Sequence, residues 1–391
     1  MPSRRAYLSA LGAVAAGAAG CVGRVRDALD DDPAVTGPCD DPDRTWPTAG
    51  GDAGRTGRTD TAPPATDADA VDLLAGVRDD GRRRLASSLP AVGDGVAYVP
   101  TGGGVAAVDV DDPASDPVWA RDLDADVDAV PALACGVVFA AGLNRLFALD
   151  AETGETYWQA DVGGHEATAV APSDETVYVA GVAPVAVDVR TGDVEWRADG
   201  GDTLAVGVNG VYSTRNANGV GDLYAHDSEG EGRWHLAPGK IVGSASVLDR
   251  TVYAADNRGT VYAVDATTGV TRWSRSLDGV EKVHSGLAVR GDDVVVPAGT
   301  GDRSAVLDAA TGETRWRADT GIVTGRPVVG GDWVAFGRTN VGVTVYDRAT
   351  GERRASWTRE EYDLGTVDGL VPVEEGFVVR GGTTSGLALI R

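Results

Sequence analysis

The stretch "TVYAADNRGTVYAVDATTGVTRW" (251–273) contains short runs rich in valine, tyrosine and tryptophan, separated by polar turns. Such runs predict antiparallel strands, and this part of the chain shows no helical period. Its final phrase, "DATTGVTRW" (265–273), returns as "DAETGETYW" (150–158), "DVRTGDVEW" (188–196) and "DAATGETRW" (308–316). A phrase that recurs this often predicts a repeated structural unit instead of a single catalytic motif.

Each residue type in the phrase has a predicted local role. The side chain of Asp265 can accept a hydrogen bond from the backbone two residues on, and so starts a turn. Gly269 supplies the positive φ that finishes the turn. Trp273 is expected on the outer strand of its unit, with its ring buried between one sheet and the next. The phrase therefore predicts a hairpin followed by an aromatic side chain that docks neighbouring sheets.

The spacing of these tryptophans predicts the architecture. They recur at separations of 38 to 43 residues, which is typical of propellers. The predicted blade-docking residues are Trp119, Trp158, Trp196, Trp234, Trp273, Trp316 and Trp357. First strands of the units are expected to begin near Ser88, Val130, Thr168, Thr203, Ser244, Ser285, Gly325 and Thr366. The sequence thus predicts eight blades of four strands each.

The last unit ends after three strands, which would leave an unpaired sheet edge. The run "AVDLLAGVR" (70–78) stands before the first blade, where a fourth strand is needed. We therefore predict an all-β fold over residues 70–391. It is an eight-bladed β-propeller of four-stranded antiparallel blades, closed by an N-terminal strand that pairs with the C-terminal blade.

The N-terminus carries an export pattern. In "SRRAYLSALGAVAAGAAGC" (3–21), Arg4 and Arg5 precede a short uncharged apolar run, which suits a cleaved signal better than a membrane span. The twin arginines resemble a Tat signal, and "AAGC" resembles a lipobox in which Cys21 is lipidated. Residues 1–20 are thus a predicted signal peptide, and residues 21–69, rich in Asp, Gly and Pro, a predicted disordered tether. The predicted location is the extracellular face of the cytoplasmic membrane, with the lipid anchor as the only membrane attachment.

The charge balance limits the partners. With 35 basic and 59 acidic residues the formal net charge is -24, which excludes nucleic acid as a partner. Only Lys240 and Lys282 are lysines, and acidic excess with so little lysine resembles proteins of salt-loving archaea. A GC-rich genome is the alternative explanation. If Cys21 is lipidated, two cysteines remain, Cys39 and Cys135. Either they form a disulfide with each other, or Cys135 is a buried free thiol.

The unit "VYAADNRGTVYAVDATTGVTRW" resembles the PQQ-type β-propeller repeat shared by quinoprotein dehydrogenases and BamB-type lipoproteins, and "TWPTAGGDAGRTG" (45–57) is similar to a segment that often precedes this propeller in haloarchaeal members. The resemblance covers residues 45–391. It implies that a dehydrogenase would hold its quinone between a tryptophan and a disulfide of adjacent cysteines, over a calcium ion, with a catalytic aspartate. Adjacent cysteines are absent here, so we predict no cofactor, metal or catalytic residue, and Trp333 is expected to be a core aromatic.

Loops on one face of the ring supply the candidate binding residues, since function on rigid scaffolds concentrates in loops. Turns between second and third strands carry Arg145, Arg258, Arg303 and Arg338, and blade-to-blade loops carry His165, Glu166, His284 and Arg326. These arginines either bind an acidic protein segment or an anionic glycan, or they pair with nearby aspartates. His165 and His284 belong to distant blades, so they are not expected to share a metal ion.

These observations predict an exported, monomeric, non-catalytic propeller that serves as a protein- or ligand-binding scaffold at the cell surface. Two alternatives stay open. One is a quinoprotein-like, PQQ-dependent oxidoreductase, and the other is a sugar- or metal-binding module that uses the mouth of the axial channel. The fold by itself does not choose among them.

Overall fold

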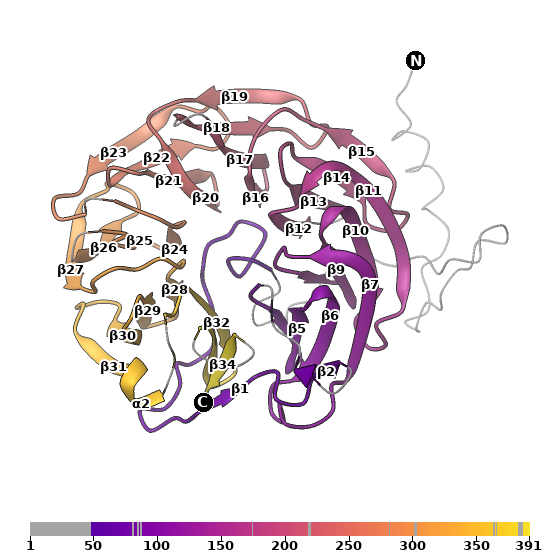
Figure 1. The fold of residues 1–391 in the computed structure, drawn as a ribbon. Helices are drawn as coiled ribbons and strands as arrows, with labels where there is room; N and C mark the ends of the chain where they lie inside the picture. Colours follow the sequence, from indigo (N-terminus) through magenta and orange to yellow (C-terminus); the bar gives the residue numbers. More distant parts are fainter. Residues whose placement is uncertain are drawn as a thin grey trace, which may run out of the picture.

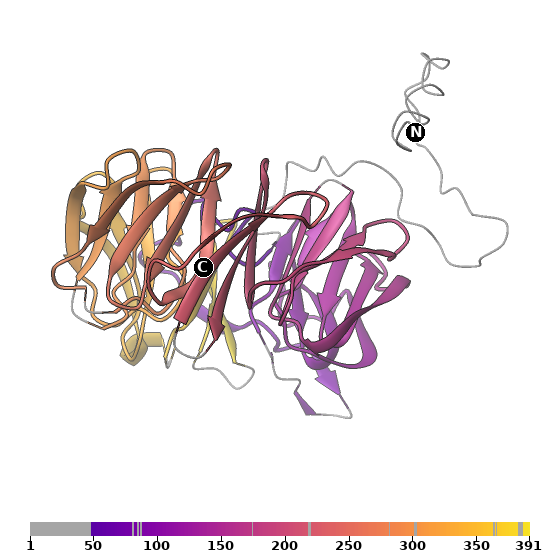
Figure 2. The same ribbon diagram turned by 90° about the horizontal axis from the view of Figure 1, so that it is seen from above.

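The computed structural model shows a closed ring of eight four-stranded antiparallel sheets, so the predicted eight-bladed β-propeller is confirmed (Figure 1). Figure 2 shows the same ring from its side. The structure describes residues 48–79, 82–83, 86, 88–173, 175–217, 220–280, 282–300, 303–362, 364, 366–381 and 386–391.

Each blade runs in chain order from an inner strand at the axis to an outer strand at the rim. Blade 1 contains β4 (Ala91–Gly93), β5 (Val96–Pro100), β6 (Gly102–Asp109) and β7 (Trp119–Val127). Blade 2 contains β8 (Ala132–Ala134), β9 (Val137–Ala141), β10 (Leu143–Asp150) and β11 (Thr156–Glu166). Blade 3 contains β12 (Ala169–Ser173), β13 (Thr176–Ala180), β14 (Val185–Asp188) and β15 (Val194–Arg197). Blade 4 contains β16 (Thr203–Gly207), β17 (Gly210–Ala217), β18 (Val220–His226) and β19 (Gly232–Leu236).

The second half of the ring follows the same plan. Blade 5 contains β20 (Ile241–Leu248), β21 (Thr251–Asp256), β22 (Thr260–Asp265) and β23 (Thr271–Ser276). Blade 6 contains β24 (Ala288–Arg290), β25 (Asp293–Val296), β26 (Arg303–Asp308) and β27 (Thr314–Asp319). Blade 7 contains β28 (Val328–Val329), β29 (Trp333–Arg338), β30 (Gly342–Asp347) and β31 (Arg353–Thr358). Outside the blades, β2 (Arg78–Asp79) pairs with β3 (Arg82–Arg83), and α2 (Arg359–Tyr362) is a single short helix.

Blade 8 is closed by the two ends of the propeller, as predicted. It contains β32 (Gly369–Val373), β33 (Gly376–Arg380), β34 (Leu387–Ile390) and, on the outside, β1 (Ala70–Asp72). Strand β1 pairs antiparallel with β34, and Val71 stands opposite Leu389. Leu73 and Leu74 follow β1 and are fully buried. The N-terminal strand therefore removes the edge that the last three strands would leave open.

The recurring Asp–Gly–Trp phrase forms the predicted hairpin. In blade 5 the Oδ1 atom of Asp265 accepts hydrogen bonds from the backbone N–H groups of Thr267 (3.1 Å) and Thr268 (2.9 Å). Gly269 closes the turn with a φ of 74°. These bonds and one from Arg272 lower the pKa of Asp265, with the bond from Arg272 the largest cause. The turn is thus held by its own aspartate in ionised form.

The glycine of the phrase has a second function that the sequence did not predict. A Cβ atom on Gly269 would lie 2.7 Å from the indole of Trp234, which belongs to the preceding blade. The same close approach joins Gly154 to Trp119, Gly192 to Trp158, Gly230 to Trp196, Gly312 to Trp273 and Gly351 to Trp316. Each glycine therefore supplies the positive φ of its turn and also leaves room for the indole ring of the preceding blade. This double role explains why glycine and tryptophan recur together in the phrase.

The tryptophans dock each blade onto the next one, as predicted. Trp273 donates its indole N–H to the carbonyl oxygen of Ala309 (2.9 Å), the residue that follows the turn aspartate of the next blade. Equivalent bonds run from Trp119 to Ala151, Trp158 to Val189, Trp196 to Ser228, Trp234 to Ala266 and Trp316 to Arg348. Trp357 is fully buried, but its N–H has no partner among the described residues. Blade 8 has no such phrase to offer a carbonyl group there.

A segment before the first blade crosses the centre of the ring. Residues 48–61, which we call the axial segment, appear in Figure 1 as an indigo loop inside the blades. The N–H groups of Val206 in β16 and Val247 in β20 donate to Ala53 and Gly54, both at 2.7 Å. The N–H groups of Val289 and Val329 donate in the same way to Thr56 (2.6 Å) and Gly57 (2.8 Å). The inner strands are sheet edges, and the axial segment satisfies their free backbone donors.

This arrangement corrects the expectation of a disordered tether over residues 21–69. Residues 48–69 lie in the structure with backbone hydrogen bonds to the ring, and residues 21–47 fall outside the described part. Glycine is what lets the segment fit, because a Cβ on Gly54 would lie 2.5 Å from the carbonyl oxygen of Val247. In this region the glycine-rich composition, which resembled that of a tether, lets the backbone of the segment approach the inner strands closely.

Candidate functional site

The loops that carry the predicted candidate binding residues lie on one face of the ring. Blade-to-blade loops and turns between second and third strands meet on one face, where isolated bridges join Val127 to Gly142, Lys282 to Thr300 and Val323 to Arg338. Arg145, Arg258, His284 and Arg303 are exposed on this face. The carboxylate of Asp319 pairs with Arg303 at 2.9 Å, and Arg145 reaches Gln159 at 3.3 Å. For Arg303 the structure therefore favours pairing with a nearby aspartate.

Two predicted residues hold loops together through hydrogen bonds. The guanidinium of Arg326 points into the ring and donates to the carbonyl oxygen of Arg55 (2.6 Å) and the hydroxyl of Ser246 (2.7 Å). Arg338 donates to the carbonyl oxygen of Thr320 and to the hydroxyl of Thr344 (3.1 Å). Arg326 thus braces loops from within the ring, which corrects its assignment to the binding face, whereas Arg338 lies partly exposed at a turn of that face. Their positions in the sequence identify a loop but not the direction of the side chain.

The remaining predicted residues fall partly outside the description. His165 and Glu166 end β11, where the structure describes their backbone alone. Cys21, Arg4 and Arg5 lie outside the described residues. Cys135 is disulfide-bonded, and the two other cysteines of the chain, Cys21 and Cys39, are also outside the described part. Trp333 is a core aromatic as predicted, 2% exposed, with its ring centroid 5.6 Å from that of Phe377.

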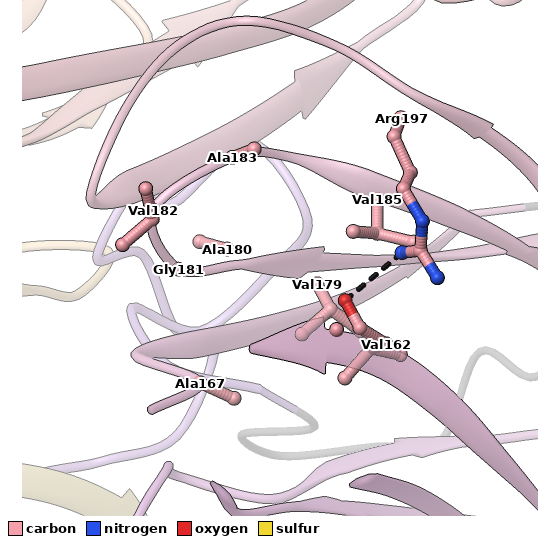
Figure 3. Close-up of a pocket in the computed structure, with 10 residues that line it drawn as sticks. Val162, Ala167, Val179, Ala180, Gly181, Val182, Ala183, Val185 and Arg197 are labelled. Atoms are coloured by element: carbon pink, nitrogen blue, oxygen red, sulfur yellow. Dashed lines mark hydrogen bonds between the residues drawn. The ribbon is translucent and has the colours of Figure 1, made fainter. Parts of the chain in front are cut away.

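An apolar pocket of about 300 Å³ opens on this face between blades 2 and 3 (Figure 3). It is lined by Val162, Gly163, Ala167, Val179, Ala180, Gly181, Val182, Ala183, Val185 and Arg197. Arg197 forms one wall and donates to the carbonyl oxygens of Val162 (2.9 Å) and Asp161 (3.0 Å). Val182, at the turn between β13 and β14, is 49% exposed. The pocket is therefore an apolar hollow with a cation at its edge.

A second pocket, of about 490 Å³, adjoins the first and shares Arg197. Here the rings of Tyr224 and His235 stack with centroids 4.6 Å apart, and His235 lies 3.3 Å from the carboxylate of Asp222. His226 is 4% exposed, and burial is the largest cause of its lowered pKa. His226 is therefore a buried, neutral residue at pH 7, in keeping with its position in the third strand of blade 4.

Neither pocket was predicted from the sequence, although a signal was present. The turn "GVAP" (181–184) of blade 3 carries valine and alanine, where the equivalent turns of blades 2 and 5 carry Asn144 with Arg145 and Asn257 with Arg258. An apolar turn tip on an otherwise acidic protein is the departure from the repeat that marks the site.

The described residues contain no cluster of three or more His, Cys, Asp or Glu side chains placed to hold a metal ion. Among them there is also no helix of the length and apolarity that a membrane crossing requires.

The family model described as outer membrane protein assembly factor BamB matches residues 101–214 and 219–365, which together make up more than half of the chain. The chain belongs to the BamB family. BamB from Moraxella catarrhalis shares 18% identity with it over 85% of this chain and 96% of that chain, with a TM-score of 0.58. No curated protein sequence matches the chain significantly.

Other members of the wider fold are enzymes. Quinohemoprotein alcohol dehydrogenase from Comamonas testosteroni is 16% identical over 89% of this chain and 80% of that chain, with a TM-score of 0.65. A europium-containing methanol dehydrogenase is 14% identical over 89% and 97% of the two chains, also with a TM-score of 0.65. At these identities the likeness to this BamB-family chain is one of fold.

The residues of this BamB-family protein do not fit a quinone cofactor held over calcium. None of its three cysteines is adjacent to another in the sequence. The axial segment also lies along the inner strands of blades 4 to 7, inside the ring. We therefore derive no redox step through that cofactor.

Proposed function

We propose that this protein is a non-catalytic scaffold that binds a protein partner at the apolar pocket between blades 2 and 3. The main support for this proposal is the pocket itself. Its walls are aliphatic, its rim holds the guanidinium of Arg197, and Val182 at its edge is 49% exposed. An aliphatic side chain of the partner fills the hollow, in the manner of an interface anchor surrounded by polar groups.

The surroundings of the pocket support a protein partner with acidic residues near its anchor. Leu143, at the corresponding turn of blade 2, is 54% exposed and extends the apolar surface of the same face. Arg145 is exposed beside it in β10 and offers a cation to a carboxylate of the partner. The blades fix these groups on rigid strands, so little ordering cost accompanies binding.

A charge placed in the pocket tests the proposal. The Val182→Asp variant is expected to lose at least about tenfold in affinity, since a buried unpaired carboxylate in an apolar contact costs more than about 1.4 kcal/mol. The matched control is Val208→Asp, because Val208 is 90% exposed at the turn between β16 and β17, on the opposite face.

The measurement is quantitative capture of partners from a membrane extract of the source cells by each purified variant, with the bound proteins identified by mass spectrometry. The proposal requires one or more proteins to be captured by the wild type and by Val208→Asp but not by Val182→Asp. Equal capture by all three proteins would overturn it.

We further propose export through the twin-arginine signal and anchoring through a lipid on Cys21. The motifs at Arg4, Arg5 and Cys21 support this proposal. Replacing Cys21 with serine is expected to move most of the protein from the membrane fraction to the soluble fraction, because the lipid supplies the attachment. The Cys135→Ser variant should stay in the membrane fraction. An unchanged distribution of Cys21→Ser would contradict lipid anchoring without affecting the pocket.

A further inference from the structure

One buried arginine, Arg55, and one half-buried arginine, Arg326, lie side by side at the axis of the ring. Arg55 comes from the axial segment and is 8% exposed, and Arg326 comes from the loop before β28. Both guanidinium groups donate to the same hydroxyl of Ser244, Arg55 through Nη1 at 3.3 Å and Arg326 through Nη2. Two positive charges are thus held against one small side chain.

The acceptors around them are neutral. Arg326 donates to the carbonyl oxygens of Arg55, Leu287 and Ser244 and to the hydroxyls of Ser244 and Ser246. The Nε and Nη2 atoms of Arg55 are buried and have no hydrogen-bond partner among the described residues.

The nearest acid in the sequence of the axial segment, Asp52, is already engaged. Its carboxylate accepts from the N–H and the hydroxyl of Thr56, at 2.9 Å and 2.6 Å, and pairs with Arg58 at 3.1 Å. No carboxylate of the described residues forms an ion pair with Arg55 or Arg326.

Burial of two like charges without a counter-charge is strongly unfavourable. Burial lowers the pKa of Arg55 to about 10. Burial, and then the charge of Arg55, lower the pKa of Arg326 to about 9. Both groups therefore stay protonated at neutral pH. The carboxylate of Asp52 attracts Arg326 without forming an ion pair with it, so the two charges are only partly balanced.

We propose that the axis of the ring binds one small inorganic anion, of the size of chloride or nitrate, on the free edge of the Arg55 guanidinium beside Arg326. The Nε–H and Nη2–H bonds of an arginine lie on one edge of its planar group and form a fork that takes a halide or two oxygens. The neighbouring Arg326 is closely packed, since a Cβ on Gly286 would lie 1.9 Å from its Nη2 atom, and the proposal is therefore restricted to small anions.

The anion would link the axial segment to blades 5, 6 and 7 through its two arginines. Its binding is therefore expected to stabilise the folded ring, which gives a measurement that needs neither a partner nor an activity. The unfolding temperature of the purified protein is measured from millimolar to molar sodium chloride. Sodium gluconate, whose anion is too large for the site, keeps the ionic strength constant.

At chloride concentrations about one hundred times its dissociation constant, linkage predicts a rise in unfolding temperature of about 4 °C for a chain of this length. Sodium nitrate in place of chloride should produce a rise of the same kind, and crystals soaked in bromide should show an anomalous peak beside Arg55. An unfolding temperature that does not depend on the anion, together with no bromide peak, would mean that water alone fills the site and would overturn the proposal.

Two variants locate the effect. Arg55→Met removes the fork and is expected to abolish the chloride dependence. Arg290→Met is the matched control, because Arg290 also holds the axial segment, through the carbonyl oxygen of Thr59 (2.8 Å) and the carboxylate of Asp60 (2.6 Å). It is expected to lower the unfolding temperature but to keep the chloride dependence. Persistence of that dependence in Arg55→Met would place the anion elsewhere, and the bromide experiment on the wild type decides the matter if Arg55→Met does not fold.

Discussion

The Trp273→Ala variant is expected to lower the free energy of unfolding by about 4 kcal/mol, the usual cost of truncating a large buried aromatic side chain. Trp273 is 8% exposed, its ring centroid lies 6.2 Å from that of Tyr253, and its N–H reaches the carbonyl oxygen of Ala309 in the next blade. The loss therefore includes packing within blade 5 and a hydrogen bond to blade 6. Urea denaturation followed by tryptophan fluorescence and circular dichroism measures it.

Gly312 makes this prediction specific to docking between blades. A Cβ on Gly312 would lie 2.7 Å from the ring of Trp273, and its φ is 72°. Gly312→Ala alone should cost about 1 to 3 kcal/mol through overpacking and backbone strain. In the Trp273→Ala background the indole ring that the new Cβ atom would contact is absent, so only the backbone strain of Gly312→Ala remains. The double variant should thus be less destabilised than the sum of the single variants, and strict additivity would contradict direct contact.

Closure of the ring gives the second large effect. Replacing Leu73 with aspartate places a carboxylate where the side chain is fully buried next to β1, and the free energy of unfolding should fall by more than about 4 kcal/mol. Because β1 is the outer strand of blade 8, the same change should also expose the joint between β1 and β34 to proteases. Urea denaturation and limited proteolysis followed by mass spectrometry measure the two effects.

The matched control lies two residues away, in β1 itself. Val71 pairs with Leu389 through its backbone but is 41% exposed, so Val71→Asp should change stability by no more than about 0.5 kcal/mol. Similar losses in both variants would mean that charge in this strand, and not burial at the joint, destabilises the protein. Wild-type stability of Leu73→Asp would contradict the closing role of the segment.

The ring could be predicted from the sequence because its determinants are local and repeated. The Asp265 turn, the positive φ of Gly269 and the burial of Trp273 all act within a few residues, and their recurrence fixes the number of blades. Closure was also predictable, because an unpaired third strand at the C-terminus requires a partner and residues 70–78 were the available candidate. The contact between Gly312 and Trp273 joins different units, so the repeat of a single phrase did not reveal it.

The axial segment could not be predicted in the same way. Residues 48–61 are polar and rich in glycine, and their order depends on backbone donors such as those of Val206 and Val329, which are distant in the sequence. Composition alone cannot distinguish a chain that is solvated from one that lies along sheet edges. For the same reason Arg326 resembled a surface residue, although its guanidinium contacts both the axial segment and the inner strands.

The candidate site was partly predictable. Its face followed from the order of strands within a blade, and Arg145 and Arg258 are exposed there as expected. The apolar pocket was missed because it depends on how the turn at Val182 meets the end of β11 in the neighbouring blade. The equivalent turns of other blades carry arginine, so the repeat indicates charge at this position and not an apolar side chain.

The position of the axial segment has a consequence for the order of events during synthesis. The segment leaves the ribosome before any blade, yet its main-chain acceptors meet donors as late as Val329. The axial segment therefore lacks part of its hydrogen-bond partners until six sheets and the first strand of the seventh have been made, and β1 lacks its partner until Leu387–Ile390 follows. Pairing between residues that are far apart in the sequence favours slow folding.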